Sequence, residues 1–129
     1  MYILIGVVLG IIAALVMPIY IPTAYSLYVA VAILASLDSV VGGILAHLSK
    51  TFDTKVFVTG FFTNAFFAAG LTWLGKKLGV DISLAAIVAF GVRIFQNCAT
   101  IRRYIFNILE QKRKQKKTNT DVGGEKENV

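Results

Sequence analysis

The chain has 129 residues, of which 57% are hydrophobic and only 16% are charged, and its formal net charge is +6. This balance, with a mean hydropathy of +0.73, argues against a soluble enzyme and favours an integral membrane protein. The positive charge gathers near the carboxyl end beside apolar segments, which indicates a membrane topology signal and argues against a nucleic-acid partner.

The first apolar segment covers residues 2–17 and ends at Pro18, which cannot continue a helix. At ~1.5 Å per residue such a helix reaches ~25 Å, which is marginal for a bilayer core ~30 Å thick. Gly6, Gly10 and Ala14 recur at every fourth position in this segment. The spacing bares one strip of backbone and predicts a face for close helix packing.

The second and third apolar segments, residues 24–47 and 56–74, carry further small residues at helical spacing. In the second segment they surround Asp38, and in the third Gly60 stands four residues before Asn64. Short side chains let helix backbones approach closely in a bilayer. We therefore predict a set of helix-packing positions, namely Gly6, Gly10, Ala14, Ala35, Ser39, Gly42, Gly43 and Gly60.

A short connection at residues 75–81 precedes the fourth apolar segment, and Asp81 is placed to cap the helix that follows. The fourth segment includes Arg93. Apolar residues contribute about 0.3–0.6 kcal/mol each to insertion, which together outweighs about 2.5–3.5 kcal/mol for one central arginine. We therefore expect four spans, while two lysines in the connection keep three spans as the alternative.

The predicted fold class is an all-α membrane protein, a small antiparallel bundle of four or three transmembrane helices. The positive-inside rule places the basic carboxyl end in the cytoplasm, and four spans would place the amino terminus there too. The sequence thus predicts a multi-pass protein with both ends on the same side of the membrane.

After the fourth segment, residues 101–109 carry apolar side chains on one helical face. We expect this basic amphipathic helix to leave the bilayer core and lie along the membrane surface. Residues after Lys117 have almost nothing to bury and are expected to be disordered. The chain would then divide into an integral membrane domain, residues 1–109, and a basic, largely disordered tail, residues 110–129. The side chains expected to contact anionic phospholipids are Arg102, Arg103, Lys112, Arg113, Lys114, Lys116 and Lys117.

Three polar residues of different apolar segments fall at similar depths. Counted along four spans, Asp38, Arg93 and Asn64 lie ~21, ~18 and ~15 Å into a core ~30 Å thick. Arginine keeps its proton, whereas aspartate can be neutralised by protonation, so Arg93 needs a counter-ion. We predict an Asp38/Arg93 pair, within one chain or between chains, with Asn64, Gln96 and Asn97 completing a polar cluster.

The pair has two open interpretations. It could fix the register of two helices, or Asp38 could belong to a route for protons or ions. A route usually needs several titratable groups, and the apolar segments hold no second carboxylate, which favours the structural interpretation. The sequence shows neither a nucleophile beside a base nor a cluster with metal-ligand spacing, so we expect no enzyme activity, no cofactor and no metal.

Three stretches of the sequence carry a resemblance to a known family. They are "IPTAYSLYVAVAILASLDSVVGGILAHL" (21–48), "FVTGFFTNAF" (57–66) and "LGVDISLAAIVAFGVRIFQNCATIRR" (78–103). Together they resemble the bacterial small basic protein family, a family of unknown function. The positions that fit its motifs are Asp38, Gly42, Gly43, Gly60, Asn64, Asp81, Gly91, Arg93, Gln96, Asn97, Arg102 and Arg103.

The resemblance implies a small multi-pass protein of the bacterial plasma membrane, often encoded near cell-division genes. It implies no activity, ligand or catalytic residue. The leading hypothesis is a non-enzymatic membrane protein that assembles with itself or with envelope and division proteins. The alternative is a small channel or carrier for protons, ions or a solute, with Asp38 and Arg93 lining its path.

Overall fold

The computed structural model describes the backbone of residues 2–126 and the side chains of residue 2 and residues 4–119. The described chain forms four helices and contains no strand: α1 (Tyr2–Val16), α2 (Thr23–Leu48), α3 (Thr54–Leu78) and α4 (Ile82–Lys126). The all-α prediction is therefore confirmed, and each predicted apolar segment corresponds to one helix or to its apolar part.

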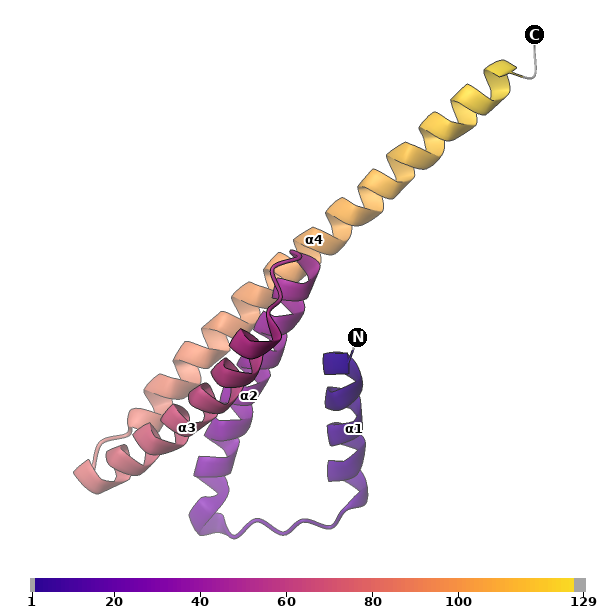
Figure 1. The fold of residues 1–129 in the computed structure, drawn as a ribbon. Coiled ribbons are helices and arrows are strands. Elements are labelled where there is room, and N and C mark those ends of the chain that lie inside the picture. The colour runs from indigo at the N-terminus through magenta and orange to yellow at the C-terminus, as the bar shows by residue number, and fades with distance from the viewer. Residues whose placement is uncertain (1, 127–129) are drawn as a thin grey trace.

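Helices α2, α3 and α4 form the packed part of the molecule (Figure 1). The connections at residues 49–53 and 79–81 are short, so α3 runs antiparallel to α2 and α4 returns parallel to α2. Helix α1 stands apart, is joined by an extended connection and contacts only α2 among the described helices. Asp38, Asn64 and Arg93 all lie in this three-helix unit.

Local side-chain chemistry fixes the ends of α3. Asp53 Oδ1 accepts the backbone N–H groups of Lys55 (2.8 Å) and Val56 (3.2 Å), which caps the helix start. Gly79 adopts φ 67°, a left-handed conformation that ends the helix at little cost for glycine. Asp81 in turn accepts the backbone N–H of Leu84 at the start of α4, as predicted.

The predicted connection at residues 75–81 begins too early, because α3 continues through Leu78. Gly75 is buried inside the helix, where a Cβ atom would lie 2.7 Å from the carbonyl oxygen of Val80. Glycine at this position thus allows the returning chain to pack tightly and does not stop the helix.

The core of the described chain is small and built from small residues. Val31, Ala35, Ala68 and Ala86 are its buried apolar side chains. Their size lets the three helices approach closely, as small residues do in membrane bundles. The total exposed area is 10234 Å², against about 6,700 Å² for a compact soluble protein of the same mass. Much of the apolar surface is therefore left for lipid or for other chains.

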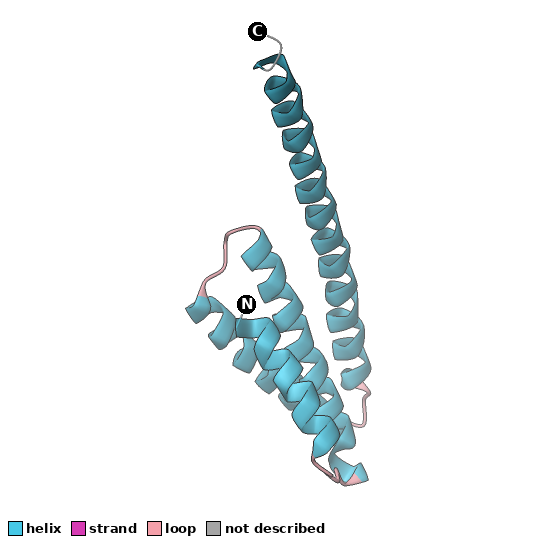
Figure 2. Cartoon of the chain, turned by 90° about the vertical axis from the view of Figure 1, so that its right-hand side faces the viewer, coloured by secondary structure: helices cyan, strands magenta, loops and turns pink. Residues whose placement is uncertain are grey.

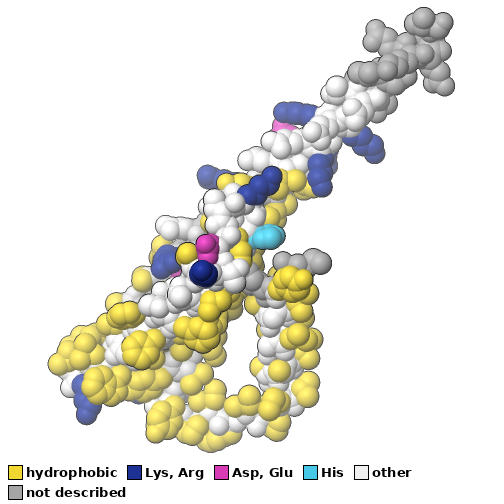
Figure 3. All heavy atoms as spheres, in the orientation of Figure 1, with side chains coloured by type: hydrophobic (Ala, Val, Ile, Leu, Met, Phe, Trp, Pro, Cys, Tyr) yellow, Lys and Arg dark blue, Asp and Glu magenta, His cyan; other side chains and the backbone are white. Residues whose placement is uncertain are grey.

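Within the part of the chain that the structure describes, three helical stretches are long and apolar enough to cross a membrane: α2, α3 and residues 82–119 of α4. The apolar part of α1 is shorter. Figure 3 shows hydrophobic side chains over most of the bundle and over α1, with Lys and Arg side chains gathered along the projecting part of α4. This distribution agrees with the membrane class predicted from composition.

Helix α4 differs from its predicted course. It is one continuous helix through Lys126 that projects straight beyond the bundle (Figure 2), without a bend that would lay residues 101–109 along a membrane surface. The disorder predicted after Lys117 is also absent from 118–126, whereas residues 127–129 lie outside the described chain.

Local interactions account for the length of α4. No proline or glycine stands between positions 92 and 122, so nothing in that stretch breaks the helix. Glu110 and Lys114 form an (i, i+4) ion pair of 2.9 Å, which supports the helix on its exposed surface. Composition alone suggested disorder because this stretch has no core to join, yet helix formation does not require one.

Candidate functional site

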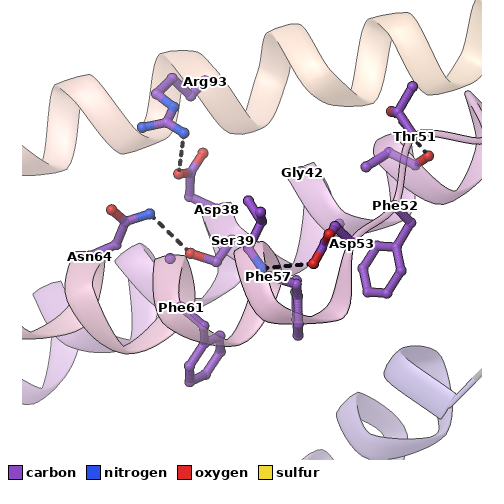
Figure 4. Close-up of a pocket in the computed structure, with 14 residues that line it drawn as sticks. Asp38, Ser39, Gly42, Thr51, Phe52, Asp53, Phe57, Phe61, Asn64 and Arg93 are labelled. Atoms are coloured by element: carbon purple, nitrogen blue, oxygen red, sulfur yellow. Dashed lines mark hydrogen bonds and ion pairs between the residues drawn. The ribbon is translucent and has the colours of Figure 1, made fainter.

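The structure brings Asp38 of α2 and Arg93 of α4 together within one chain. Arg93 Nη2 lies 3.2 Å from Asp38 Oδ2. The two helices run parallel, so residues near the middle of each can meet across their interface. Figure 4 shows the two side chains pointing toward each other from these helices. The ion pair therefore joins α2 to α4 at one defined register.

The two partners differ sharply in exposure. The Asp38 side chain is 0% exposed, whereas the Arg93 side chain is 57% exposed. Among the residues that the structure describes, none donates a hydrogen bond to either carboxylate oxygen of Asp38. The carboxylate thus depends on Arg93 for compensation, while much of the guanidinium faces outward.

A second polar contact links α2 to α3 beside the ion pair. Asn64 Nδ2 donates to Ser39 Oγ at 3.1 Å, and Ser39 Oγ donates to the Ala35 carbonyl at 3.2 Å. Because Ser39 uses its own proton on Ala35, it can only accept from Asn64. This fixes the amide orientation and leaves Asn64 Oδ1 as an open acceptor.

The other two amides of the predicted cluster take different positions. Asn97 is half-buried, and a Cβ atom at Gly42 would lie 3.8 Å from its Nδ2 atom. Gln96 is exposed on α4, one turn after Arg93. The structure thus places Asp38, Arg93 and Asn64 together, Asn97 against α2, and Gln96 on the outer surface.

The predicted small-residue positions separate into two groups. Those of α2 lie inside the unit, where Ala35 and Gly43 are buried. A Cβ atom at Gly6 or Gly10 of α1, or at Gly60 of α3, would meet nothing within 4 Å. The α2 positions therefore pack within the chain, and Ser39 and Gly42 also line the cavity between α2 and α3. Gly6, Gly10 and Ala14 of α1 face α2 and α3 across a groove that they line together with residues of those helices.

A cavity of about 240 Å³ adjoins the ion pair. Asp38, Arg93 and Asn64 lie at its polar end. It extends past Gly42 and Gly60 to the 49–53 connection. Figure 4 shows the Phe57 and Phe61 rings pointing away from the ion pair, while Thr51, Phe52 and Asp53 lie at the end of the cavity next to the connection.

Sequence reasoning missed the aromatic part of this cavity. Phe52, Phe57 and Phe61 form a chain of ring contacts, with centroid distances of 5.6 and 6.2 Å. The signal was present, because Phe57 and Phe61 are four residues apart on one face of α3. It was not recognised because phenylalanine in an apolar segment is usually read as lipid-facing or core.

The core closes the bundle on the other side of the ion pair. Val31 and Ala35 precede Asp38 on α2 and pack with Ala68 and Ala86. All four are buried. The cavity therefore reaches Asp38 from the side of the 49–53 connection.

The predicted lipid-contacting residues lie along the exposed part of α4. Arg102, Arg103 and Lys112 to Lys117 are all exposed. Lys114 also pairs with Glu110. These cations surround the helix on several sides and form no single flat face.

Comparison with known proteins places this arrangement in a family. The family described as "Protein of unknown function (DUF1290)" matches residues 21–106. The chain belongs to this family. The match includes α2, α3 and the apolar part of α4, and so contains both partners of the ion pair, while α1 precedes it.

Individual relatives agree with the family match. The chain is 51% identical over 112 residues to the "Small basic protein" of Bacillus subtilis, covering 87% of this chain and 93% of the relative. It is 42% identical over 99 residues to uncharacterised proteins of Mycobacterium tuberculosis and Mycobacterium bovis, covering 75% of this chain and 82% of each relative. No solved structure matches the chain. The resemblance to the small basic protein family is confirmed, and the description of the matching family assigns it no function.

Proposed function

We propose that this chain is a non-enzymatic integral protein of the plasma membrane that assembles with copies of itself or with other envelope proteins. The observation that carries the proposal is the exposure of Arg93, whose side chain is 57% exposed although it stands within an apolar stretch long enough to span. A charge at that depth is costly when it faces lipid. A neighbouring chain that covers Arg93 would remove this cost.

The surface around Arg93 supports the same proposal. Ala89, Gln96 and Thr100 are exposed, and their spacing places them on the same face of α4 as Arg93. Small and polar residues are typical of helix–helix contacts in membranes, where amides hydrogen-bond across helices. We call these four residues the Arg93 strip.

The orientation of the helices in the membrane is part of the same proposal. If α2, α3 and α4 cross, the 49–53 connection and the projecting part of α4 lie at the same end of the bundle. The basic residues of α4 would place this end in the cytoplasm, against anionic phospholipid. A crossing α1 would put the amino terminus there as well. A partner in the division machinery is supported only by what the family resemblance implies.

The experiment is a measurement of oligomer mass. The protein is reconstituted in nanodiscs and its copy number is determined by native mass spectrometry, for the wild type and for Gln96→Leu. We expect more than one copy for the wild type and a smaller fraction of oligomers for Gln96→Leu. Phe95→Leu is the matched control, because Phe95 is exposed on a different face of α4. A wild-type protein that is strictly monomeric, and that also binds no other membrane protein in its native membrane, would contradict the proposal.

A second candidate function, a carrier for a small cation, is favoured by the cavity that reaches the ion pair from one side. Because the core closes the other side, transport would require the helices to rearrange. Cation flux into liposomes that disappears in Asp38→Asn would support a carrier. Flux equal to that of empty liposomes would remove this candidate.

A further inference from the structure

Polar side chains stand at both ends of the cavity beside the ion pair. Asn64 and Arg93 line its inner end, and Thr51 and Asp53 line the end next to the 49–53 connection. We propose that the cavity is an aqueous vestibule, which brings water and small hydrophilic solutes from this connection into the middle of the bundle. The vestibule is separate from the assembly role and does not depend on it.

The inner end offers hydrogen-bonding groups that suit water. Asn64 Nδ2 donates to Ser39, whereas Asn64 Oδ1 accepts no hydrogen bond from the described residues. Arg93 meets Asp38 through Nη2, and a guanidinium carries five N–H donors. Water can donate to the amide oxygen and accept from the guanidinium, while both Asp38 oxygens stay shielded behind Arg93. An acyl chain in the same space would leave these polar groups without partners, which is costly.

The cavity has room for several water molecules. Its volume is about 240 Å³, whereas one water molecule takes about 30 Å³ in the liquid. Small residues create this space, because Ala46 and Gly60 line the cavity and a Cβ atom at Gly60 would meet nothing within 4 Å. Room and polar partners are the two conditions that a buried hydrated site must meet.

An aromatic wall separates the vestibule from an apolar groove. Phe57 and Phe61 line the cavity and also line the groove between α1 and the bundle. That groove is otherwise lined by apolar residues and by Ser36, whose hydroxyl donates to the Ala32 carbonyl. The groove therefore suits lipid chains, and the two rings keep them apart from the polar end of the cavity.

The vestibule opens toward one end of the bundle. The buried core lies on the far side of Asp38, and the connection lies at the end from which α4 projects. Water would therefore reach Arg93 from this end alone. Among the four residues of the Arg93 strip, only Arg93 lines the cavity. A neighbouring chain can thus cover the strip without closing the vestibule.

The test measures how fast single cysteines react with a water-soluble thiol reagent. In a Cys98→Ser background, Gly60→Cys places a thiol on the cavity wall. Val58→Cys and Phe62→Cys are matched controls, because both residues are exposed on α3, lie outside the cavity lining and bracket Gly60 in depth. The full-length protein in liposomes is treated with 2-(trimethylammonium)ethyl methanethiosulfonate, which does not cross a bilayer. We expect Gly60→Cys to react at least tenfold faster than Phe62→Cys and faster than Val58→Cys. A rate no higher than that of Val58→Cys would follow depth alone and would overturn the proposal.

The side from which the reagent reacts is a second readout. Lys112→Cys lies on the projecting part of α4, at the end where the vestibule opens, and Lys77→Cys lies at the other end of the bundle. Gly60→Cys should react from the same side as Lys112→Cys, whichever side of the membrane that is. This comparison therefore holds even if the proposed orientation or the assembly role is wrong. Reaction from the side of Lys77→Cys would overturn a vestibule that opens at the 49–53 connection.

A cysteine at the inner end tests how far water penetrates. Ser39 lines the cavity, ~14 Å along α2 from the helix end at Leu48. Leu37 lies at nearly the same depth but lines the groove toward α1, so Leu37→Cys is the matched control. We expect Ser39→Cys to react at least tenfold faster than Leu37→Cys. Equal rates would overturn the claim that water reaches the ion pair.

Two glycine variants locate the path within the Ser39→Cys protein. Adding Gly60→Leu should fill the cavity and slow the reaction at least tenfold. Gly70 lies on the same helix, a Cβ atom there would also meet nothing within 4 Å, and it does not line the cavity, so adding Gly70→Leu should leave the rate unchanged. An unchanged rate with Gly60→Leu would overturn the assigned path. If Gly60→Leu fails to fold, the comparison of Gly60→Cys with its two controls still decides the proposal.

Discussion

Asp38 and Arg93 compensate each other's charge. Because the two side chains differ in burial, removing Arg93 and removing the Asp38 charge should destabilise the chain by different amounts. Without Arg93, the Asp38 carboxylate would remain with 0% side-chain exposure and no hydrogen-bond donor among the described residues. Without the Asp38 charge, the exposed half of Arg93 could still contact polar groups of the neighbouring chain that we propose over the Arg93 strip. Chemistry alone suggested that arginine depends more on the pair, whereas burial reverses this order.

We therefore predict that Arg93→Gln destabilises the chain more than Asp38→Asn does. The expected losses are about 3 kcal/mol for Arg93→Gln, which leaves an uncompensated buried charge, and about 1 kcal/mol for Asp38→Asn. Thermal unfolding in detergent measures both. The double variant should lose less than the sum of the single variants, because they remove the same contact. Equal losses, or the reverse order, would contradict this account of the pair.

Two adjacent glycines of α2 give a second prediction at this scale. A Cβ atom at Gly43 would lie 2.8 Å from two ring carbons of Phe57, whereas one at Gly42 would lie 3.8 Å from Asn97 Nδ2. Gly43→Ala should therefore destabilise by about 1–3 kcal/mol through overpacking, and Gly42→Ala should be neutral or stabilising. Thermal unfolding separates the two, and Gly43→Ala combined with Phe57→Leu should recover stability. If Gly43→Ala does not lower the thermal stability, the Phe57 ring moves aside without cost and the overpacking account is wrong.

The helices show how much of the element structure follows from the sequence. The apolar segments and their boundaries predict all four helices. A transmembrane helix needs a long apolar stretch, and proline ends a helix. The straight continuation of α4 beyond Thr100 could not be predicted from the sequence. Composition indicates how much apolar surface a segment can bury, and it does not indicate whether the backbone remains helical. Likewise, the Asp38/Arg93 contact could be predicted from matching depths, but the cavity beside it depends on where the Phe57 ring turns.

Helix α1 yields a prediction at this scale. Because a Cβ atom at Gly6 or Gly10 would meet nothing within 4 Å, Gly6→Ala and Gly10→Ala should change the free energy of unfolding of the α2–α4 unit by no more than about 0.5 kcal/mol. Thermal unfolding in detergent tests this, with Gly43→Ala as the destabilising comparison. A large loss in either α1 variant would mean that this face packs against the bundle in solution.

At the scale of the whole molecule, most apolar surface is left uncovered by the fold. The three-helix unit buries few side chains, and α1 adds little to it. In our proposal the surroundings complete the chain, with lipid over the apolar faces and another helix over the Arg93 strip. The family match supports the three-helix unit as the shared part, since it begins just before α2.

The proposed crossing of α4 makes a topological prediction. In a Cys98→Ser background, Lys77→Cys near the end of α3 and Lys112→Cys on the projecting part of α4 should react with impermeant thiol reagents from opposite sides of the membrane. Cys98 of the wild type lies on α4 between these ends and should react slowly when lipid surrounds it. Reaction of both new cysteines from the same side would mean that α4 does not cross.

The most direct test of the proposed assembly is thiol crosslinking in the native membrane. In a Cys98→Ser background, Ala89→Cys places a thiol on the Arg93 strip, and Phe95→Cys places one on a different exposed face of α4. We predict that a short bifunctional thiol reagent traps Ala89→Cys as a dimer or as an adduct with another membrane protein, and leaves Phe95→Cys largely monomeric. Equal crosslinking of the two variants, or none in either, would contradict the claim that Arg93 is covered by a neighbouring chain.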